Sequence, residues 1–247
     1  MRLKDKVAVV SGAGSGFGEG IARTFAREGA RVVVADIDAA NGARVARDIA
    51  GAVFCKTDVS KNAEVKAMIA AAVENFGGLD IVVNNAGVAQ RRMPMLDVPE
   101  ETFDRIFAVN VKSIYLSAIH AVPVLKARGG GVIVNIASTA AGRPRPGLTW
   151  YNGSKGAVVT LTRSMAVELA PDKIRVVAIN PVLGETGLTA EFMGGDTPEL
   201  RARFIAGIPL GRLSQPEDVA NAAVYLVSGE AEFITGVCLD VDGGRSV

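Results

Sequence analysis

The stretch that decides the fold reads Val7-Ala8-Val9-Val10-Ser11-Gly12-Ala13-Gly14-Ser15-Gly16-Phe17-Gly18, and it is followed by apolar residues at helical spacing, Ile21, Ala22, Phe25 and Ala26. This pattern predicts a buried strand, a sharp glycine-rich turn and a helix. Glycines let the backbone approach a ligand closely, and the amides at the start of a helix bind phosphate. A flexible loop without a ligand is the alternative, but the position between a strand and a helix favours a nucleotide site.

The next apolar run, residues 31–35, ends at Asp36. A carboxylate about twenty residues beyond the glycines accepts hydrogen bonds from a ribose diol and repels a 2′-phosphate, so the sequence predicts NAD and makes NADP the less favoured cofactor. The alternative role for Asp36 is the N-cap of the following helix, which Asp38 fits better.

Short apolar runs alternate with helical patterns along the rest of the chain. They predict strands at 53–55, 79–83, 131–137, 174–179 and 237–240, and helices at 63–76 and 216–227. A long apolar segment, 101–127, predicts a buried helix and is a candidate oligomer face. We therefore expect an α/β fold, in which a single domain (1–247) contains a doubly wound (Rossmann) parallel seven-stranded sheet with helices on both faces.

Composition narrows the class of protein. The chain has 247 residues, of which 49% are hydrophobic and 21% charged, so it can bury a large core. A formal charge of +1 provides no overall field for binding nucleic acid or an anionic membrane. We find no signal peptide, no membrane-spanning run and no Cys/His cluster, so the expectations are a cytoplasmic location and no metal.

Polar and small residues follow two of the predicted strands. Residues 84–87, Asn-Asn-Ala-Gly, come after the fourth strand, and Ser138 comes after the fifth. The carboxyl ends of parallel strands meet at one edge of the sheet, which is where open α/β sheets bind their ligands. We expect both segments to lie beside the glycine turn, although a serine at a strand end is often only a turn former.

Tyr151 and Lys155 stand four residues apart on the next predicted helix, so their side chains share one face. A phenol has a pKa of roughly 10, and a nearby positive charge favours the phenolate. The pair is therefore a candidate proton-transfer device. A packed ring beside a solvated amine is the alternative.

Beyond Pro181 the pattern loosens over residues 183–213. A substrate lid and a plain surface insertion are both compatible with this segment. Leu183, Leu188, Phe192 and Met193 would give a lid an apolar inner face, which suits a modestly hydrophobic substrate.

Taken together, these segments resemble the short-chain dehydrogenase/reductase family, in the branch that includes 3-oxoacyl-carrier-protein reductases and glucose dehydrogenases. The resemblance spans nearly the whole chain. It is carried by Ser11-Gly12 with Gly16 and Gly18, Asp58-Val59, residues 84–87, Asn110, Ser138, Tyr151 with Lys155, Asn180-Pro181 and Asp242-Gly243-Gly244.

The resemblance implies an NAD(P)-dependent oxidoreductase that transfers a hydride between nicotinamide and a secondary alcohol or ketone, with NAD(H) preferred. By the same resemblance Tyr151 is the general acid/base, Ser138 binds the substrate oxygen, Lys155 holds the nicotinamide ribose and lowers the tyrosine pKa, and Asn110 supports a water-linked proton relay. A homotetramer is also implied. The implied cofactor-binding residues are Gly12, Ser15, Gly16, Phe17, Gly18, Asp36, Asp58, Val59, Asn85, Ala86, Gly87, Tyr151, Lys155, Pro181, Leu183 and Thr186.

Two departures from the family pattern stand out. The glycine that commonly follows Asn-Pro is Val182 here, and a glycine comes two positions later, at Gly184. Thr186 still stands where the family contacts the nicotinamide carboxamide, so we expect cofactor binding with an altered backbone path. Phe17 replaces the usual isoleucine in the glycine turn and should act as a bulky apolar plug.

Two other functions and one site question stay open at this point. A 3-oxoacyl thioester reductase using NADPH is one alternative, and a dinucleotide sensor without turnover is another. Two arginine pairs, Arg91-Arg92 and Arg143-Arg145, leave strand ends near the expected site. They are either a basic rim for an anionic substrate or solvated loop charges.

Overall fold

The computed structural model describes residues 1–187 and 189–247, apart from the side chains of residues 190 and 191, and in this part of the chain seven parallel strands form one sheet in the order β3-β2-β1-β4-β5-β6-β7. The order reverses between β1 and β4, as expected for a doubly wound sheet. The predicted fold class is confirmed. The strands are β1 (Val7–Ser11), β2 (Arg31–Asp36), β3 (Val53–Lys56), β4 (Ile81–Asn84), β5 (Gly131–Ile136), β6 (Ile174–Pro181) and β7 (Cys238–Val241).

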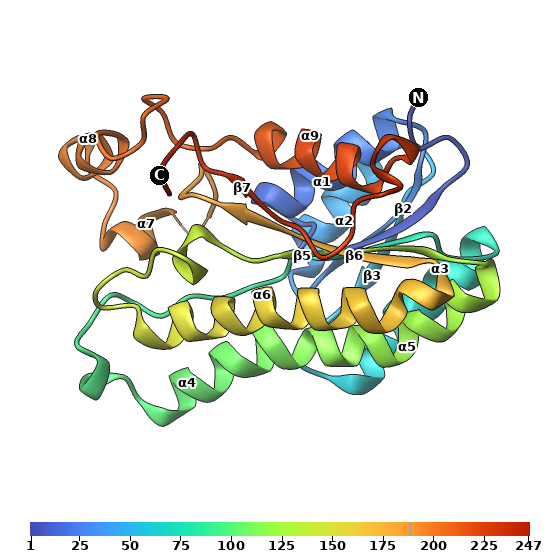
Figure 1. Ribbon diagram of the computed structural model, residues 1–247, viewed down its shortest axis with the longest axis horizontal. Coiled ribbons are helices and arrows are strands. Elements are labelled where there is room, and N and C mark those ends of the chain that lie inside the picture. Colours follow the sequence, from blue (N-terminus) through green and yellow to red (C-terminus); the bar gives the residue numbers. More distant parts are fainter. Residues whose placement is uncertain (188) are drawn as a thin grey trace.

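Helices cover both faces of the sheet because its strands are apolar on both sides (Figure 1). Along β1, Ala8 and Val10 pack on one face, while Val7 and Val9 pack on the other. The first face is covered by α1 (Gly16–Arg27), α2 (Ala39–Asp48) and α9 (Pro216–Val227), and the second by α3 (Asn62–Phe76), α5 (Ser113–Arg128) and α6 (Thr149–Leu169).

The long apolar segment is interrupted, which corrects the expectation of one helix over 101–127. Helix α4 (Glu100–Phe107) passes through a π-helical turn at Ala108–Lys112 before α5 begins. Such turns are frequent at functional sites, and this one contains Asn110. By length and composition alone, Glu100–Arg128 is apolar enough to cross a membrane, but here it packs against α3 and α6.

Two short helices follow β6 on the side where the parallel strands end. They are α7 (Thr189–Met193) and α8 (Pro198–Ile205). Val182, Ile208 and Leu213 form a small apolar cluster beneath them. Leu188, one of the four expected inner-face residues, lies outside the described residues. The 3-10 turns are Met95–Asp97, Thr139–Ala141, Ala170–Asp172 and Gly229–Ala231.

Candidate active site

A cavity of about 700 Å³ opens at the carboxyl edge of the sheet, around the point where the strand order reverses. Its wall contains every predicted site residue except Gly18 and Asn110. The predicted residues that line it are Gly12, Ser15, Gly16, Phe17, Asp36, Asp58, Val59, Asn85, Ala86, Gly87, Ser138, Tyr151, Lys155, Pro181, Leu183 and Thr186. The structure therefore brings segments from seven parts of the sequence to one cavity.

The glycine turn fits a dinucleotide phosphate. Gly12 and Gly16 have φ angles of 63° and 55°, which side-chain-bearing residues rarely adopt, and both line the cavity. Gly18 does not line it. A Cβ on Gly18 would lie 2.1 Å from the carbonyl oxygen of Gly12, so this glycine lets the first turn of α1 close onto the loop. The cradle in front of α1 stays open for an anion.

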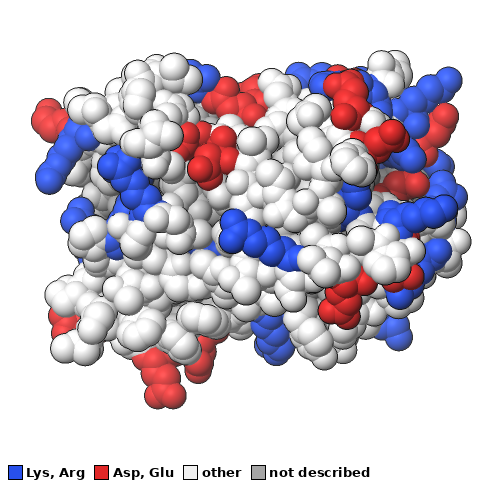
Figure 2. Space-filling model, in the orientation of Figure 1, with Lys and Arg blue, Asp and Glu red and all other residues white. Residues whose placement is uncertain are grey.

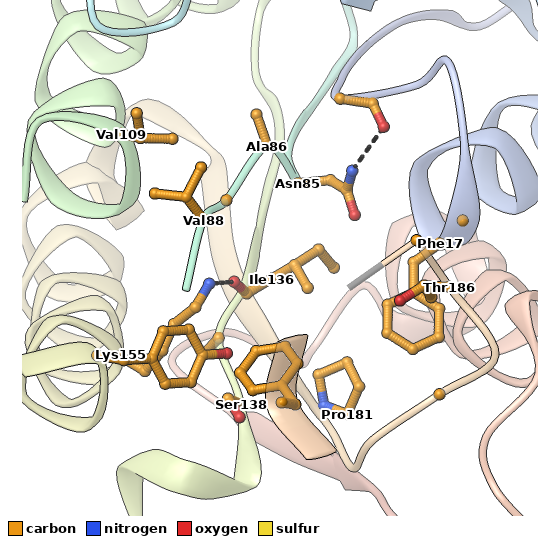
Figure 3. A pocket seen from close by; sticks show the side chains of 18 of the residues that line it. Phe17, Asn85, Ala86, Val88, Val109, Ile136, Ser138, Lys155, Pro181 and Thr186 are labelled. Carbon is orange, nitrogen blue, oxygen red and sulfur yellow. Dashed lines mark hydrogen bonds between the residues drawn. The ribbon is translucent and has the colours of Figure 1, made fainter. Parts of the chain in front are cut away.

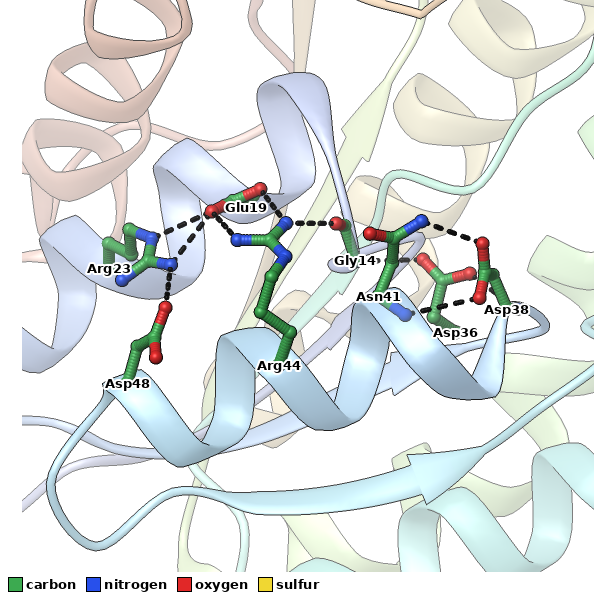
Figure 4. Close-up of polar contacts among 8 residues, drawn as sticks. All are labelled: Gly14, Glu19, Arg23, Asp36, Asp38, Asn41, Arg44 and Asp48. Carbon is green, nitrogen blue, oxygen red and sulfur yellow. Dashed lines mark hydrogen bonds and ion pairs between the residues drawn. The ribbon is translucent and has the colours of Figure 1, made fainter.

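The carboxylate of Asp36 is tied to the glycine turn (Figure 4). It accepts hydrogen bonds from the backbone nitrogens of Gly14, at 2.7 Å, and of Asp38, at 2.8 Å. The N-cap of α2 is Asp38, which accepts from Ala40 N and Asn41 N, so the assignment of the cap to Asp38 is confirmed. Asp36 is thus held in a fixed position at the cavity wall.

A network that the sequence did not reveal lies next to Asp36. Arg44 donates to both carboxylate oxygens of Glu19, at 3.0 and 2.8 Å, and to the carbonyl oxygen of Gly14 at 3.1 Å. Arg23 pairs with the same glutamate and with Asp48 (Figure 4). The hydrogen bond from Arg44 is the main reason why the pKa of Glu19 is lowered. These two arginines are therefore already paired with carboxylates.

Asn85 joins the end of β4 to the glycine turn. Its side-chain nitrogen donates to the carbonyl oxygens of Ser11, at 2.8 Å, and Gly12, at 3.1 Å, and Figure 3 shows this side chain on the wall beside Ala86. The Ser11 hydroxyl in turn accepts from the backbone nitrogens of Asn85 and Ala86. The two strand ends are thus fixed relative to one another.

Asn110 lies behind the wall. Its side-chain oxygen accepts from Val88 N at 2.9 Å, and its side-chain nitrogen donates to Val88 O at 2.9 Å and to Ser154 Oγ at 3.0 Å. The residue is 2% exposed, so its amide group cannot bind water. These three hydrogen bonds take the place of the ones that water would otherwise provide. Asn110 connects the π-helical turn with the segment after β4 and with α6.

Tyr151 and Lys155 share one face of α6, as predicted, and lie beside Ser138 at the end of β5. The Lys155 ammonium donates to the carbonyl oxygen of Ile136 at 2.8 Å and lies 5.9 Å from the centre of the Tyr151 ring. Figure 3 shows Lys155 reaching across to Ile136, with Ser138 on the same side of the cavity. The ring of Phe192 closes the other side and packs edge-on against Tyr151 at 5.1 Å between centres.

The pKa of Tyr151 differs from the expectation. Burial raises it to about 12, while the neighbouring Ser138 hydroxyl and the charge of Arg145 act in the opposite direction. The expected lowering by Lys155 is not found in this cavity, because desolvation of the phenolate outweighs the nearby charges. Burial also lowers the pKa of Lys155, to about 8. The phenol is therefore a proton donor at neutral pH.

The two arginine pairs separate in space. Arg145 lines the cavity, whereas Arg143 donates to the backbone carbonyl of Arg245 at the C-terminal end of the chain. Arg92 packs against the loop at Gly147, and Arg91 is exposed. Only one of the four arginines therefore faces the ligand space.

Sequence reasoning missed several contacts of the site. The carbonyl of Ile136 gave no signal, because a backbone acceptor is the same at every residue. Val88 and Leu148 line the cavity although they belong to no motif. Phe192 was expected only as an inner-face residue of a lid, without its contact to Tyr151.

Comparison with known proteins gives consistent relatives. The family model described as "Enoyl-(Acyl carrier protein) reductase" matches residues 12–246. The chain is 50% identical to the 4-formylbenzenesulfonate dehydrogenase TsaC1/TsaC2 of Comamonas testosteroni, over 100% of both chains. It is 38% identical to the galactitol 2-dehydrogenase of Agrobacterium fabrum, over 99% of both.

The solved structures include a close neighbour as well. The crystal structure of 3-ketoacyl-(acyl-carrier-protein) reductase from Brucella melitensis, complexed with NADH, matches with a TM-score of 0.94 and 50% identity. The match covers 99% of this chain and 100% of that one. The matched region therefore includes the segments that line the cavity as well as the strands of the sheet.

Proposed function

Because the chain belongs to the short-chain dehydrogenase/reductase family, we propose that Tyr151 is the general acid/base of its reaction and that Ser138 and Lys155 assist it. The chain is an NAD(P)-dependent oxidoreductase that acts on alcohols and ketones, as its dehydrogenase relatives do. One observation carries the proposal: Ser138, Tyr151 and Lys155 line the same cavity as the glycine turn.

The residues of this chain have separate tasks. The glycine turn binds the phosphates of the dinucleotide, and Asp36 accepts hydrogen bonds from the adenosine ribose. When bound, the nicotinamide supplies the hydride or takes it up. Ser138 donates a hydrogen bond to the substrate oxygen and holds the carbonyl beside Tyr151. In reduction the phenol of Tyr151 donates its proton to that oxygen, and in oxidation the phenolate takes it from the alcohol.

Lys155 supports this proton transfer by its charge. Its ammonium is anchored on the carbonyl oxygen of Ile136 and stands near the Tyr151 ring, so it stabilises the phenolate when one forms. Its remaining hydrogen-bond donors would hold the nicotinamide ribose. Asn110 is a positioning residue in this scheme, because its side chain is engaged by Val88 and Ser154.

NAD(H) is the preferred cofactor in this proposal. The charge of Asp36 at the cavity wall repels a 2′-phosphate. Arg44 and Arg23, the basic side chains nearest to it in the network of Figure 4, are committed to Glu19. A 2′-phosphate would therefore meet a carboxylate without a free arginine in that network to offset it.

The remaining parts of the proposal concern the whole molecule. Residues 1–247 act as one domain, and residues 183–213 act as a substrate lid, because Phe192 and Leu183 face the cavity. The chain assembles as a homotetramer in the cytoplasm. Exposed apolar side chains support assembly, with Tyr115 61% and Val167 80% exposed on α5 and α6. A monomer in sedimentation velocity experiments at micromolar concentration would contradict the tetramer.

The test of the proposed role is the variant Tyr151→Phe. Turnover with a panel of secondary alcohols, sugars, ketones and 3-oxoacyl thioesters should fall by at least about a hundredfold, the lower bound for loss of a general acid/base. The dissociation constant for NADH, measured by fluorescence titration, should change little. The matched control is Tyr115→Phe, on the exposed side of α5. Full activity of Tyr151→Phe would refute the assignment.

A further inference from the structure

Arg145 is held in place at the substrate end of the cavity. It belongs to the loop before α6, and its carbonyl oxygen accepts a hydrogen bond from Asn152 Nδ2 at 2.9 Å. Its guanidinium carbon lies 5.2 Å from the centre of the Phe204 ring on α8. The backbone is thus fixed to the helix that carries Tyr151, and the charged group is fixed to the segment on the opposite side.

Within the described part of the chain, the charge of Arg145 is not balanced by a carboxylate. The side chain is partly buried, and none of the described acidic side chains forms an ion pair with it. Burial lowers the pKa of Arg145, and the charges of Arg245, Arg143 and Arg92 act in the same direction, whereas Tyr151 acts in the opposite one. Like charges gathered in a partly buried place repel one another, and an anion placed among them removes this cost.

Other arginines of the chain show what the usual arrangement is. Arg201 pairs with Glu185 and Asp196, and Arg212 pairs with Asp218. Figure 2 shows basic side chains grouped at the end of the molecule where α7 and α8 lie. Among the described residues, Arg145 thus lines the cavity without a carboxylate partner, whereas Arg201 on the neighbouring helix α8 is paired with two.

The space next to Arg145 is apolar. Leu148, Ala140 and Phe192 pack around the Tyr151 ring and form one cluster. Among the described side chains, the carboxylates that line the cavity are Asp36, at the end of β2, and Asp58, which follows β3. A molecule whose oxygen reaches Tyr151 thus finds apolar side chains along its body and a guanidinium beyond them.

We propose that the substrate is an organic anion: an alcohol or carbonyl compound with an apolar body and a carboxylate or sulfonate remote from the reacting carbon, which Arg145 binds. This inference rests on the proposed function for the reacting end of the substrate. A guanidinium recognises both acids by the same paired donation of hydrogen bonds to two oxygens. Arg145 is then the residue that determines specificity.

The test compares matched pairs of ketones with NADH as the reductant. The pairs are 4-oxocyclohexanecarboxylate with its amide, and 4-acetylbenzenesulfonate with its sulfonamide. The anion should have a kcat/KM about 10- to 100-fold above that of its neutral partner, the range for one hydrogen bond to a charged group. In Arg145→Gln this ratio should fall to about one, in Arg145→Lys part of it should remain, and in the control Arg143→Gln it should persist.

Two outcomes would overturn the proposal. One is a ratio near one in the unmodified enzyme, and the other is a ratio that survives Arg145→Gln. A preference for 3-oxobutyryl-CoA over both small anions, lost in Arg143→Gln, would also overturn it, because the basic groups would then serve a carrier phosphate. Turnover of the neutral ketones tests the proposed oxidoreductase activity independently of the anion site.

A binding measurement separates this inference from the proposed function. The non-reacting anion 4-tert-butylbenzoate is titrated calorimetrically into the enzyme saturated with NAD. Binding that is at least about tenfold weaker in Arg145→Gln supports the anion site even if none of the ketones is turned over. Equal binding by both enzymes contradicts the site, whatever the turnover.

Discussion

The ring of Phe17 occupies the space that a side chain at residue 184 would need. A Cβ built on Gly184 would lie 2.4 Å from Cζ of Phe17, closer than atoms can approach. The two departures from the family pattern therefore belong together, since the larger residue in the glycine turn requires a glycine in the segment after β6. Both residues line the cavity, and Val182 packs with Ile208 and Leu213 below it.

Gly184→Ala should weaken the site by overpacking. We expect a loss of about 1–3 kcal/mol in the free energy of unfolding and a weaker affinity for NADH, because the added methyl group displaces the Phe17 ring. Phe17→Ile, added to Gly184→Ala, should restore part of the stability and part of the NADH affinity. The recovery should be incomplete because the carbonyl oxygen of Ser214 lies 2.9 Å from the added carbon. Thermal unfolding and NADH titration of the two single variants and the double variant measure the coupling. Strictly additive effects would show that the contact has no energetic consequence.

Asp36→Asn should shift the cofactor preference toward NADPH. Removal of a like charge beside the 2′-phosphate relieves a repulsion of several kcal/mol, so NADPH affinity should rise by roughly a hundredfold. Asp38→Asn is the matched control, because Asp38 caps α2 and does not line the cavity. An equal rise in NADPH affinity in the control would mean that the net charge of the protein, and not the position of Asp36, causes the effect.

Glu19→Gln, introduced into Asp36→Asn, should increase NADPH affinity further. Arg44 loses its carboxylate partner and becomes available to the 2′-phosphate. One hydrogen bond to a charged group should increase NADPH affinity by roughly tenfold. NADH affinity should stay unchanged in the same titrations. If NADPH affinity does not rise, Arg44 does not reach the phosphate.

Lys155→Met should stabilise the fold at pH 7 while it removes activity. The pKa of Lys155 is about 8 in the folded chain, against 10.5 for an unperturbed lysine. Below pH 8 the folded chain therefore bears the cost of a buried ammonium, and between about pH 8 and 10.5 the unfolded chain binds more protons, so this cost fades as the pH rises.

The expected gain at pH 7 is about 1–3 kcal/mol, which corresponds to a rise in the melting temperature of about 2–4 °C per kcal/mol. The advantage over the unmodified protein should shrink toward pH 10.5 in the same thermal scans. Lys66→Met, at an exposed position on α3, is the control and should show no such pH dependence. A less stable Lys155→Met protein at pH 7 would mean that the hydrogen bond to Ile136 outweighs the burial of the charge.

Asn110→Leu should destabilise the wall after β4. The backbone nitrogen and oxygen of Val88 would both lose their partners on Asn110 in a partly buried place, at a cost of up to about 1–3 kcal/mol for each unsatisfied group. Ser154→Ala removes the third bond of Asn110 and the bond from Ser154 Oγ to the carbonyl oxygen of Tyr151, but it leaves Val88 paired and should cost less. Urea unfolding measures both, and NADH affinity should fall with Asn110→Leu. Equal stability of the two variants would contradict the positioning role.

Local patterns were sufficient to predict the fold. The apolar run at 7–10, the glycines at 12–18 and the alternation of strands with helices each depend on residues close together in the chain, so their physical cause is present in the sequence. The edge at which Ser138 and residues 84–87 meet follows from the parallel direction of the strands. The pairing of Tyr151 with Lys155 follows from the pitch of a helix.

The remaining properties depend on distances between segments far apart in the chain. Burial in the assembled cavity raises the pKa of Tyr151, although the adjacent lysine alone suggested the opposite. Four arginines looked equivalent in the sequence, and only the folded chain, in which Arg145 packs on Phe204 of α8, makes Arg145 the one of the four that lines the cavity. The residue types were visible in the sequence, but desolvation and charge pairing exist only once the chain has folded, because both depend on which groups come within a few ångströms of one another.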